Sequence, residues 1–129
     1  MARKKASPKL TPLELDLMMV LWERGPSTVQ EVQKGLASVR RLAYTTVQTM
    51  LNVLHRKKKL RRELRERAYV YHPTVSREQV THNATAEIID RFFGGSAEEL
   101  VLSLVESRRL SQDELRKLND IVEGGEWSS

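Results

Sequence analysis

Residues 44–73 read YTTVQTMLNVLHRKKKLRRELRERAYVYHP. In the first half of this stretch, apolar residues recur at the spacing of one helix face, which predicts a helix over about residues 44–57. The second half contains two short runs, at 60–64 and 68–72, separated by charged residues. The second run alternates as a strand does, so the two runs predict a β-hairpin, although the turn lacks the usual Asn-Gly or Asp-Gly pair.

Two further helices are predicted upstream of this stretch. Thr11-Pro12-Leu13-Glu14 combines a capping hydroxyl, a proline at the first helical position and a glutamate three residues after the cap. Gly25-Pro26 ends that helix, and a second capping box, Thr28-Val29-Gln30-Glu31, begins a shorter one. Three helices with brief connections, followed by a hairpin, predict a winged helix-turn-helix domain over residues 10–75, preceded by a basic tail of residues 1–9.

Residues 76–129 predict three more helices, so the expected fold is mainly α with a small β-hairpin wing. Ser76, Ser96 and Ser111 each precede a Gln or Glu by three residues, which is the pattern of a capping box. Each helix carries an apolar stripe that so short a segment cannot readily bury alone. We therefore expect a helical dimerisation domain; packing against the first domain is the alternative. The residues expected to form the dimer are Ile88, Ile89, Phe92, Leu100, Val101, Leu104, Leu115, Leu118 and Ile121.

Charge is divided unevenly between these two parts. Residues 1–75 contain 16 Lys and Arg against 6 Asp and Glu, whereas residues 76–129 contain 6 against 11. A basic first part suits a polyanion such as nucleic acid, and an acidic second part suits a protein partner. Chance asymmetry between solvated faces is the alternative interpretation.

The third predicted helix carries residue types that read DNA bases. Consecutive helical residues are rotated by about 100°, so the side opposite the apolar stripe is polar. Gln and Asn pair with adenine, Arg with guanine or phosphate, and Thr contacts the thymine methyl group. An ordinary solvent face is the alternative. The DNA-binding residues predicted on this helix and on the basic segment after it are Tyr44, Thr45, Thr46, Gln48, Thr49, Asn52, Arg56, Lys57, Lys58, Lys59, Arg62, Arg65 and Arg67.

No sequence pattern supports catalysis, a cofactor or a metal. The chain has no cysteine, and its histidines (His55, His72 and His82) lack ligand spacing. Phosphate loops and nucleophile motifs are absent. No apolar run approaches the roughly 20 residues needed to cross a bilayer, and no secretory signal is recognisable. We expect a cytoplasmic homodimer that binds double-stranded DNA; a winged-helix module that binds protein and has no DNA role is the alternative.

Several motifs together resemble a known family. They are LTPLELDLMMVLW at residues 10–22, TVQTML at 46–51, RAYVYHP at 67–73 and FFGGS at 92–96. In the same order and spacing, from about Leu10 to Val122, they resemble the penicillinase repressor family, which is the BlaI/MecI group with the copper-responsive CopY proteins as relatives.

The resemblance implies a homodimeric winged-helix repressor. Members of the family bind inverted repeats of the TACA/TGTA type near promoters, with the third helix in the major groove, the wing on the backbone and the C-terminal helices forming the dimer. In members paired with a β-lactam sensor, which control antibiotic resistance, a membrane sensor-protease is the implied partner. A cut in the C-terminal domain then abolishes dimerisation and frees the promoter, because one bivalent binder becomes two weak ones.

This sequence departs from the family pattern at three places. Copper-responsive relatives carry a cysteine motif near the C-terminus, so the absence of cysteine excludes copper sensing by that route. The staphylococcal members are cut at an Asn-Phe bond, and the corresponding pair here is Ser103-Leu104. Glycines common after the third helix and at the wing tip are replaced by Lys58 and Glu66, which leads us to expect a different wing geometry.

Overall fold

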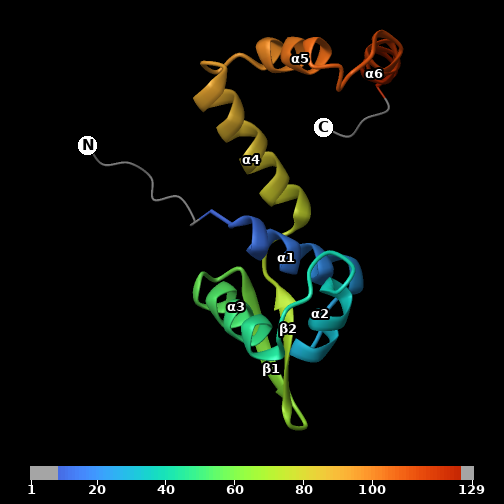
Figure 1. Ribbon diagram of the computed structural model, residues 1–129. Helices are drawn as coiled ribbons and strands as arrows, with labels where there is room; N and C mark the ends of the chain where they lie inside the picture. Colours follow the sequence, from blue (N-terminus) through green and yellow to red (C-terminus); the bar gives the residue numbers. More distant parts are fainter. Residues whose placement is uncertain (1–8, 126–129) are drawn as a thin grey trace, which may run out of the picture. The chain divides into compact units, whose positions relative to one another are not determined.

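The computed structural model describes residues 9–125, and Figure 1 shows the order of its elements. The fold is mainly helical with one two-stranded antiparallel sheet, as predicted. The chain divides into two compact units that meet between Val80 and Thr81. The elements are α1 (Pro12–Arg24), α2 (Val29–Leu36), α3 (Tyr44–Arg56), β1 (Leu60–Arg65), β2 (Ala68–Pro73), α4 (Arg77–Phe92), α5 (Ala97–Glu106) and α6 (Gln112–Gly124).

Helix α1 begins and ends where the sequence predicts. The backbone N–H of Glu14 donates to Thr11 Oγ1 at 3.1 Å, and the Thr11 N–H donates to Glu14 Oε1 at 2.8 Å, which completes a capping box. Gly25 ends the helix with a φ of 90°, a conformation that residues with a Cβ rarely adopt. The second predicted box, between Thr28 and Glu31, starts α2 in the same way.

The first unit has one hydrophobic core, to which α1, α2, α3 and the hairpin all contribute. The predicted apolar stripes supply it, since the inward residues of α2 and α3 are almost completely buried. The indole N–H of Trp22 donates to the Val75 carbonyl at 3.0 Å and ties the segment after the hairpin to α1. The buried apolar residues are Leu17, Met18, Val20, Leu21, Val29, Val32, Leu36, Val47, Leu51, Leu54, Leu60, Val70 and Tyr71.

Strands β1 and β2 form the predicted hairpin, in which Arg65 pairs with Ala68 across a two-residue turn. A short bridge fixes its base to the segment between α1 and α2. The Ser27 N–H donates to the Tyr71 carbonyl at 3.1 Å, and the Tyr71 N–H donates to the Ser27 carbonyl at 2.8 Å. Because Tyr71 is buried, the base of the hairpin belongs to the core, whereas the residues at its tip are exposed.

The two turns in which glycine is replaced form with strained backbone. Lys58 and Glu66 have φ of 65° and 58°, the left-handed conformation that glycine favours. The Thr74 hydroxyl donates to the Lys58 carbonyl at 2.7 Å, and the Thr74 N–H donates to the Lys59 carbonyl at 2.9 Å, which holds the turn before β1. Lys58 and Glu66 therefore adopt the backbone conformation that glycine favours, and the two turns form with a strained backbone.

The second unit consists of α4 from Thr81 onward, α5 and α6, and the described part of it has no buried residue. Ser111 makes a complete capping box with Glu114, and Ser96 accepts from the Glu99 N–H at 3.2 Å. Yet every residue from 81 to 125 is exposed or only half-buried, and Phe92 is 76% exposed. The helices begin where the sequence predicts, but their apolar sides lack a core within one chain.

Glu66→Gly is expected to stabilise the protein. Glycine removes the cost of the left-handed conformation at the wing tip, roughly 1–2 kcal/mol. It also raises the entropy of the unfolded chain, which offsets roughly 0.4–1 kcal/mol of that gain. The free energy of unfolding, measured by urea denaturation of the whole chain, should rise by about 0.5–1 kcal/mol. Glu66→Ala removes the same carboxylate but keeps the strain, so an equal gain in both variants would contradict the backbone explanation.

Candidate nucleic-acid interface

One exposed side of α3 brings together most of the residues predicted to read bases. The opposite side buries Val47, Leu51 and Leu54 in the core, which fixes the rotation of the helix about its axis. A polar and exposed side at this place in a helix-turn-helix is what reading of the major groove requires. The exposed residues of α3 among those predicted are Tyr44, Thr45, Thr46, Gln48, Thr49 and Arg56.

The start of α3 differs from the starts of α1 and α2. Its N-cap residue is Ala43, and no side-chain cap hydrogen bond is made there, whereas α1 and α2 have complete capping boxes. The first N–H groups of a helix, together with its dipole, attract anions such as phosphate. Tyr44 stands at this end and is 47% exposed.

Asn52 is engaged in hydrogen bonds within the first unit, which bears on its predicted role as a base reader. Its side-chain oxygen accepts hydrogen bonds from Arg62 Nη1 at 2.9 Å and from the Tyr71 hydroxyl at 3.0 Å, and the residue is half-buried. Bidentate recognition of adenine needs both the oxygen and the amide nitrogen of an Asn side chain. Because two donors already engage the oxygen, that oxygen is not free for bidentate contact with adenine in this structure.

Arg62 is likewise held within the first unit. Besides its bond to Asn52, its guanidinium carbon lies 4.3 Å from the centre of the Tyr69 ring, which is the geometry of a cation–π contact. Tyr69 and Tyr71 are two residues apart on β2 and share one face of the hairpin, with ring centres 6.5 Å apart. The Arg62 side chain therefore reaches from β1 to α3, and these two contacts fix its orientation.

Lys57 and Lys59 are less accessible than their predicted contacts with phosphate require. The ammonium of Lys57 lies 2.8 Å from both carboxylate oxygens of Glu14, a residue only 2% exposed. Lys59 is itself buried, at 8% exposure. Phosphate binding needs an accessible cation, so of the three consecutive lysines only the exposed Lys58 is suited to it.

The environment of Glu14 keeps its carboxyl group ionised. Burial raises the pKa of Glu14, but the hydrogen bond from Lys57, the bond from the Thr11 N–H and the charge of Lys57 outweigh burial. The net result is a pKa below the ordinary value of 4.5. Since the pKa is lowered on folding, this pair stabilises the fold above that ordinary pKa, and the contribution is lost as the pH falls through the lowered one.

The wing presents exposed cations at Arg61, Arg65 and Arg67. A carboxylate lies among these cations, which the sequence analysis did not predict. Glu63 Oε1 is 3.0 Å from Arg65 Nη2 and 2.9 Å from His72 Nε2. The hydrogen bond with His72 and the charge of Arg65 hold the pKa of Glu63 below its ordinary value. Within residues 9–125, Arg61 and Arg67 have no carboxylate partner and are the wing cations best suited to phosphate.

Two further cations lie ahead of α3 and were missed at the level of sequence. Lys34 and Arg41 line a small hollow between α2 and the segment leading into α3, and both are exposed. The Gln33 side-chain N–H donates to the Leu42 carbonyl at 2.9 Å and fixes that segment. The neighbouring Arg40 is paired with Asp16 at 2.6 Å. The signal that points to this group is the Arg40-Arg41 pair directly before the third helix.

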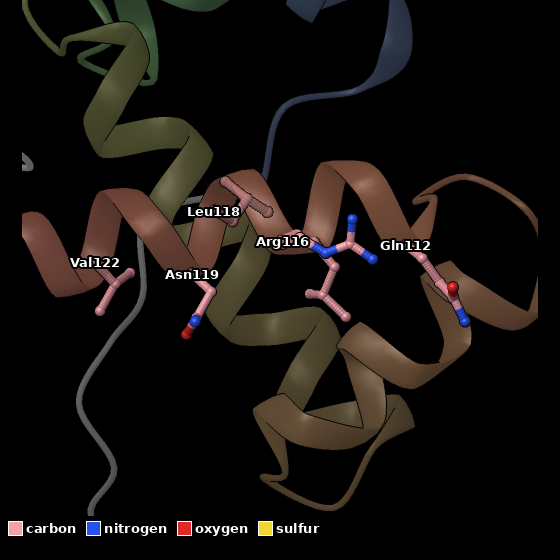
Figure 2. Close-up of a pocket in the computed structure, with 6 residues that line it drawn as sticks. Gln112, Arg116, Leu118, Asn119 and Val122 are labelled. Atoms are coloured by element: carbon pink, nitrogen blue, oxygen red, sulfur yellow. The ribbon is translucent and has the colours of Figure 1, made fainter.

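The residues predicted to form the dimer lie on helices whose apolar sides are open. Of these residues, Ile88, Phe92 and Leu118 are among the exposed large apolar side chains, and Ile89, Leu100 and Leu104 are half-buried. Figure 2 shows an open hollow on α6 that side chains of this one helix line, three of them apolar and three polar. The residues that line it are Gln112, Leu115, Arg116, Leu118, Asn119 and Val122. Ser103 and Leu104, the predicted cleavage pair, lie within α5 and are half-buried.

Among residues 9–125, no group of three or more His, Asp or Glu side chains is arranged to hold a metal ion. None of the helices described has both the length and the apolar character needed to span a membrane.

An exposed polar helix face, an uncapped helix start and a cationic hairpin define a winged helix-turn-helix protein of the DNA-binding class. The sequence model of the penicillinase repressor family matches residues 10–124, and the chain belongs to that family.

Individual relatives agree with this membership. The chain is 29% identical over 119 residues to a penicillinase repressor of Bacillus licheniformis, a match that covers 92% of this chain and 93% of the relative. It is 21% identical over 122 residues to a penicillinase repressor of Staphylococcus aureus, covering 95% of each. Among solved structures, the DNA-binding domain of the repressor BlaI matches 57% of this chain and 89% of that domain, with 32% identity and a TM-score of 0.51.

Lys57→Met is expected to destabilise the protein, because it leaves the Glu14 carboxylate buried without its cation. Breaking a buried pair costs about 3–5 kcal/mol, and the partial exposure of Lys57 reduces this to about 1–3 kcal/mol. Urea denaturation should show this loss at pH 7, and the difference from the unmodified chain should shrink as the pH falls through the lowered pKa of Glu14.

The controls for this prediction are Lys58→Met and the double variant of Glu14→Gln with Lys57→Met. The first removes an exposed lysine and should leave the free energy of unfolding nearly unchanged. The second removes both charges and should recover part of the loss. A loss in Lys57→Met that is independent of pH would contradict the assigned ion pair.

Proposed function

We propose that the protein is a transcriptional repressor that binds operator DNA through its first unit. The observation that carries this proposal is the exposed polar side of α3, flanked by the uncapped helix start and by the cations of the wing. The likeness to the DNA-binding domain of the repressor BlaI supports it over the same part of the chain. The relatives are repressors, so the proposal includes no catalytic activity and no cofactor.

The exposed residues of the first unit fall into two groups, which we propose make different contacts with DNA. Thr45, Gln48 and Thr49 lie on the exposed side of α3 and are proposed to contact base edges in the major groove. Phosphate contacts fix the register of a protein on the duplex without reading its sequence. The residues proposed for phosphate contacts are Lys34, Arg41, Tyr44, Thr46, Arg56, Lys58, Arg61, Arg62, Arg65 and Arg67.

We further propose that the second unit pairs with a second copy of the chain. Three amphipathic helices without a buried residue cannot be stable through their own packing, because the free energy of folding depends on removing apolar surface from water. A twofold dimer supplies the same apolar surface from the partner. Two reading helices related by twofold symmetry match an inverted repeat, and the TACA/TGTA type is the operator that family membership suggests.

Release from the promoter is proposed to act through this second unit. The candidate bond between Ser103 and Leu104 lies inside α5, where the Ser103 carbonyl accepts from the Ser107 N–H at 2.9 Å. A protease acts on extended chain, so α5 has to unfold locally before a cut. The proposed actor is a membrane sensor-protease, with the repressor and its operator in the cytoplasm.

Operator binding is the first test of this proposal. The whole chain is titrated with a duplex carrying a TACA/TGTA inverted repeat and with a scrambled duplex, each at two salt concentrations. We expect tighter binding to the repeat and a steep loss of affinity for both duplexes at the higher salt. Gln48→Ala should reduce the preference for the repeat by about 5- to 150-fold, whereas Lys58→Ala should weaken both alike and reduce the salt slope by about 1.

Two outcomes would count against this assignment. If Gln48→Ala weakened both duplexes equally, direct reading by the α3 side would lose its support. If neither duplex bound, the protein would be better described as a winged-helix module that binds another protein.

Dimerisation is tested by introducing the same residue on opposite sides of α6. Leu118→Lys places a charge on the apolar side, and Asp120→Lys places one on the far side of the same exposed helix. Sedimentation should show a dimer for the unmodified chain and for Asp120→Lys, and a monomer for Leu118→Lys. Asp120→Lys makes the larger change in net charge, so dissociation of both variants would indicate a charge effect instead of a lost apolar interface.

A further inference from the structure

The contact between α3 and the wing centres on one side-chain oxygen. Asn52 lies on α3, Arg62 on β1 and Tyr71 on β2, and both of the latter donate to Asn52 Oδ1, at 2.9 and 3.0 Å. The oxygen of an amide has two lone pairs, so these two donors fill it. Three elements are therefore joined at a single acceptor beside the reading side of α3.

Each donor needs this acceptor for a different reason. Tyr71 is 1% exposed, and a buried hydroxyl left without a partner is costly. Arg62 is half-buried and carries five N–H donors, of which one is given to Asn52, while the ring of Tyr69 covers one side of the guanidinium. In the described part of the chain no carboxylate pairs with Arg62. Its charge is thus oriented but not neutralised.

We infer that Asn52 is a positioning residue that holds the Arg62 guanidinium ready to contact the DNA backbone between the reading helix and the wing. A side chain that is ordered before binding loses less entropy on binding, and affinity gains accordingly. This inference rests on the DNA-binding function proposed above.

The inference predicts a different pattern from base reading by Asn52. A residue that reads bases contributes to the affinity for the operator and little to the affinity for scrambled DNA. Its contribution does not depend on Arg62. A positioning residue acts only through the group that it positions. Loss of Asn52 should then weaken both duplexes alike, and only while Arg62 is present.

The experiment is a double-mutant cycle on the whole chain, with Asn52→Ala, Arg62→Met and the double variant titrated on the inverted-repeat and scrambled duplexes. Arg62→Met should weaken both about 10-fold and reduce the salt slope by about 1. Asn52→Ala should weaken both about 3- to 10-fold. Added to Arg62→Met, it should have no further effect.

A matched control separates positioning from a general loss of stability. Ser27 is buried and its hydroxyl donates to the Gly25 carbonyl at 2.8 Å. Ser27→Ala removes this side-chain hydrogen bond, which involves neither Asn52 nor Arg62, and keeps the backbone bridge between Ser27 and Tyr71. All variants are measured well below their unfolding temperatures. Ser27→Ala should bind both duplexes as the unmodified chain does; equal weakening by Ser27→Ala and Asn52→Ala would overturn the inference.

The remaining outcomes are also decisive. Selective loss of operator binding in Asn52→Ala, or equal effects with and without Arg62, would overturn the inference and leave the repressor function standing. Failure of the unmodified chain to bind either duplex would overturn both.

Discussion

Glu14 joins the start of α1 to the end of α3 through one buried carboxylate. The same group accepts the Thr11 N–H that caps α1 and pairs with Lys57 directly after α3. A carboxylate at 2% exposure has to keep its partners, because leaving it unpaired costs several kcal/mol. The two helices therefore cannot shift independently, and the exposed side of α3 is held at a fixed rotation by this pair and by the core beneath it.

The second unit has no buried contact of this kind within the described part of the chain. Its helices are well capped, yet capping contributes only about 1 kcal/mol per helix and cannot replace a core. In the proposed dimer the second unit gains its core from a second chain, and the stability of such a unit depends on protein concentration. The first unit, by contrast, has a core of its own.

Local patterns in the sequence were sufficient to predict the helices and strands. The side-chain contacts of the candidate site, in contrast, join residues that are far apart in the sequence. Thr11 and Glu14 are three residues apart, so their capping box was predictable from spacing. Glu14 and Lys57 are 43 residues apart, and Asn52 and Tyr71 are 19 apart, so their contacts depend on how the elements pack. A polar side chain on a helix surface has the same sequence pattern whether it faces solvent, DNA or another strand. For that reason the pattern assigned all of these residues to DNA. Only the packing separates Asn52 and Lys57, which are engaged within the first unit, from Gln48 and Arg56, which are exposed and stay predictions.

The division into two units determines how a signal could act on such a repressor. The core of the first unit draws on α1, α2, α3 and the hairpin alone, so its DNA-binding surface persists when the second unit is disrupted. A dimer on an inverted repeat binds its second half-site at an effective concentration on the order of mM, which strengthens binding by about 10²- to 10⁴-fold over one half-site. An event confined to α5 or α6 removes that factor without unfolding the reading helix. Regulation by loss of valency therefore suits this architecture better than regulation by distortion of the DNA-binding surface.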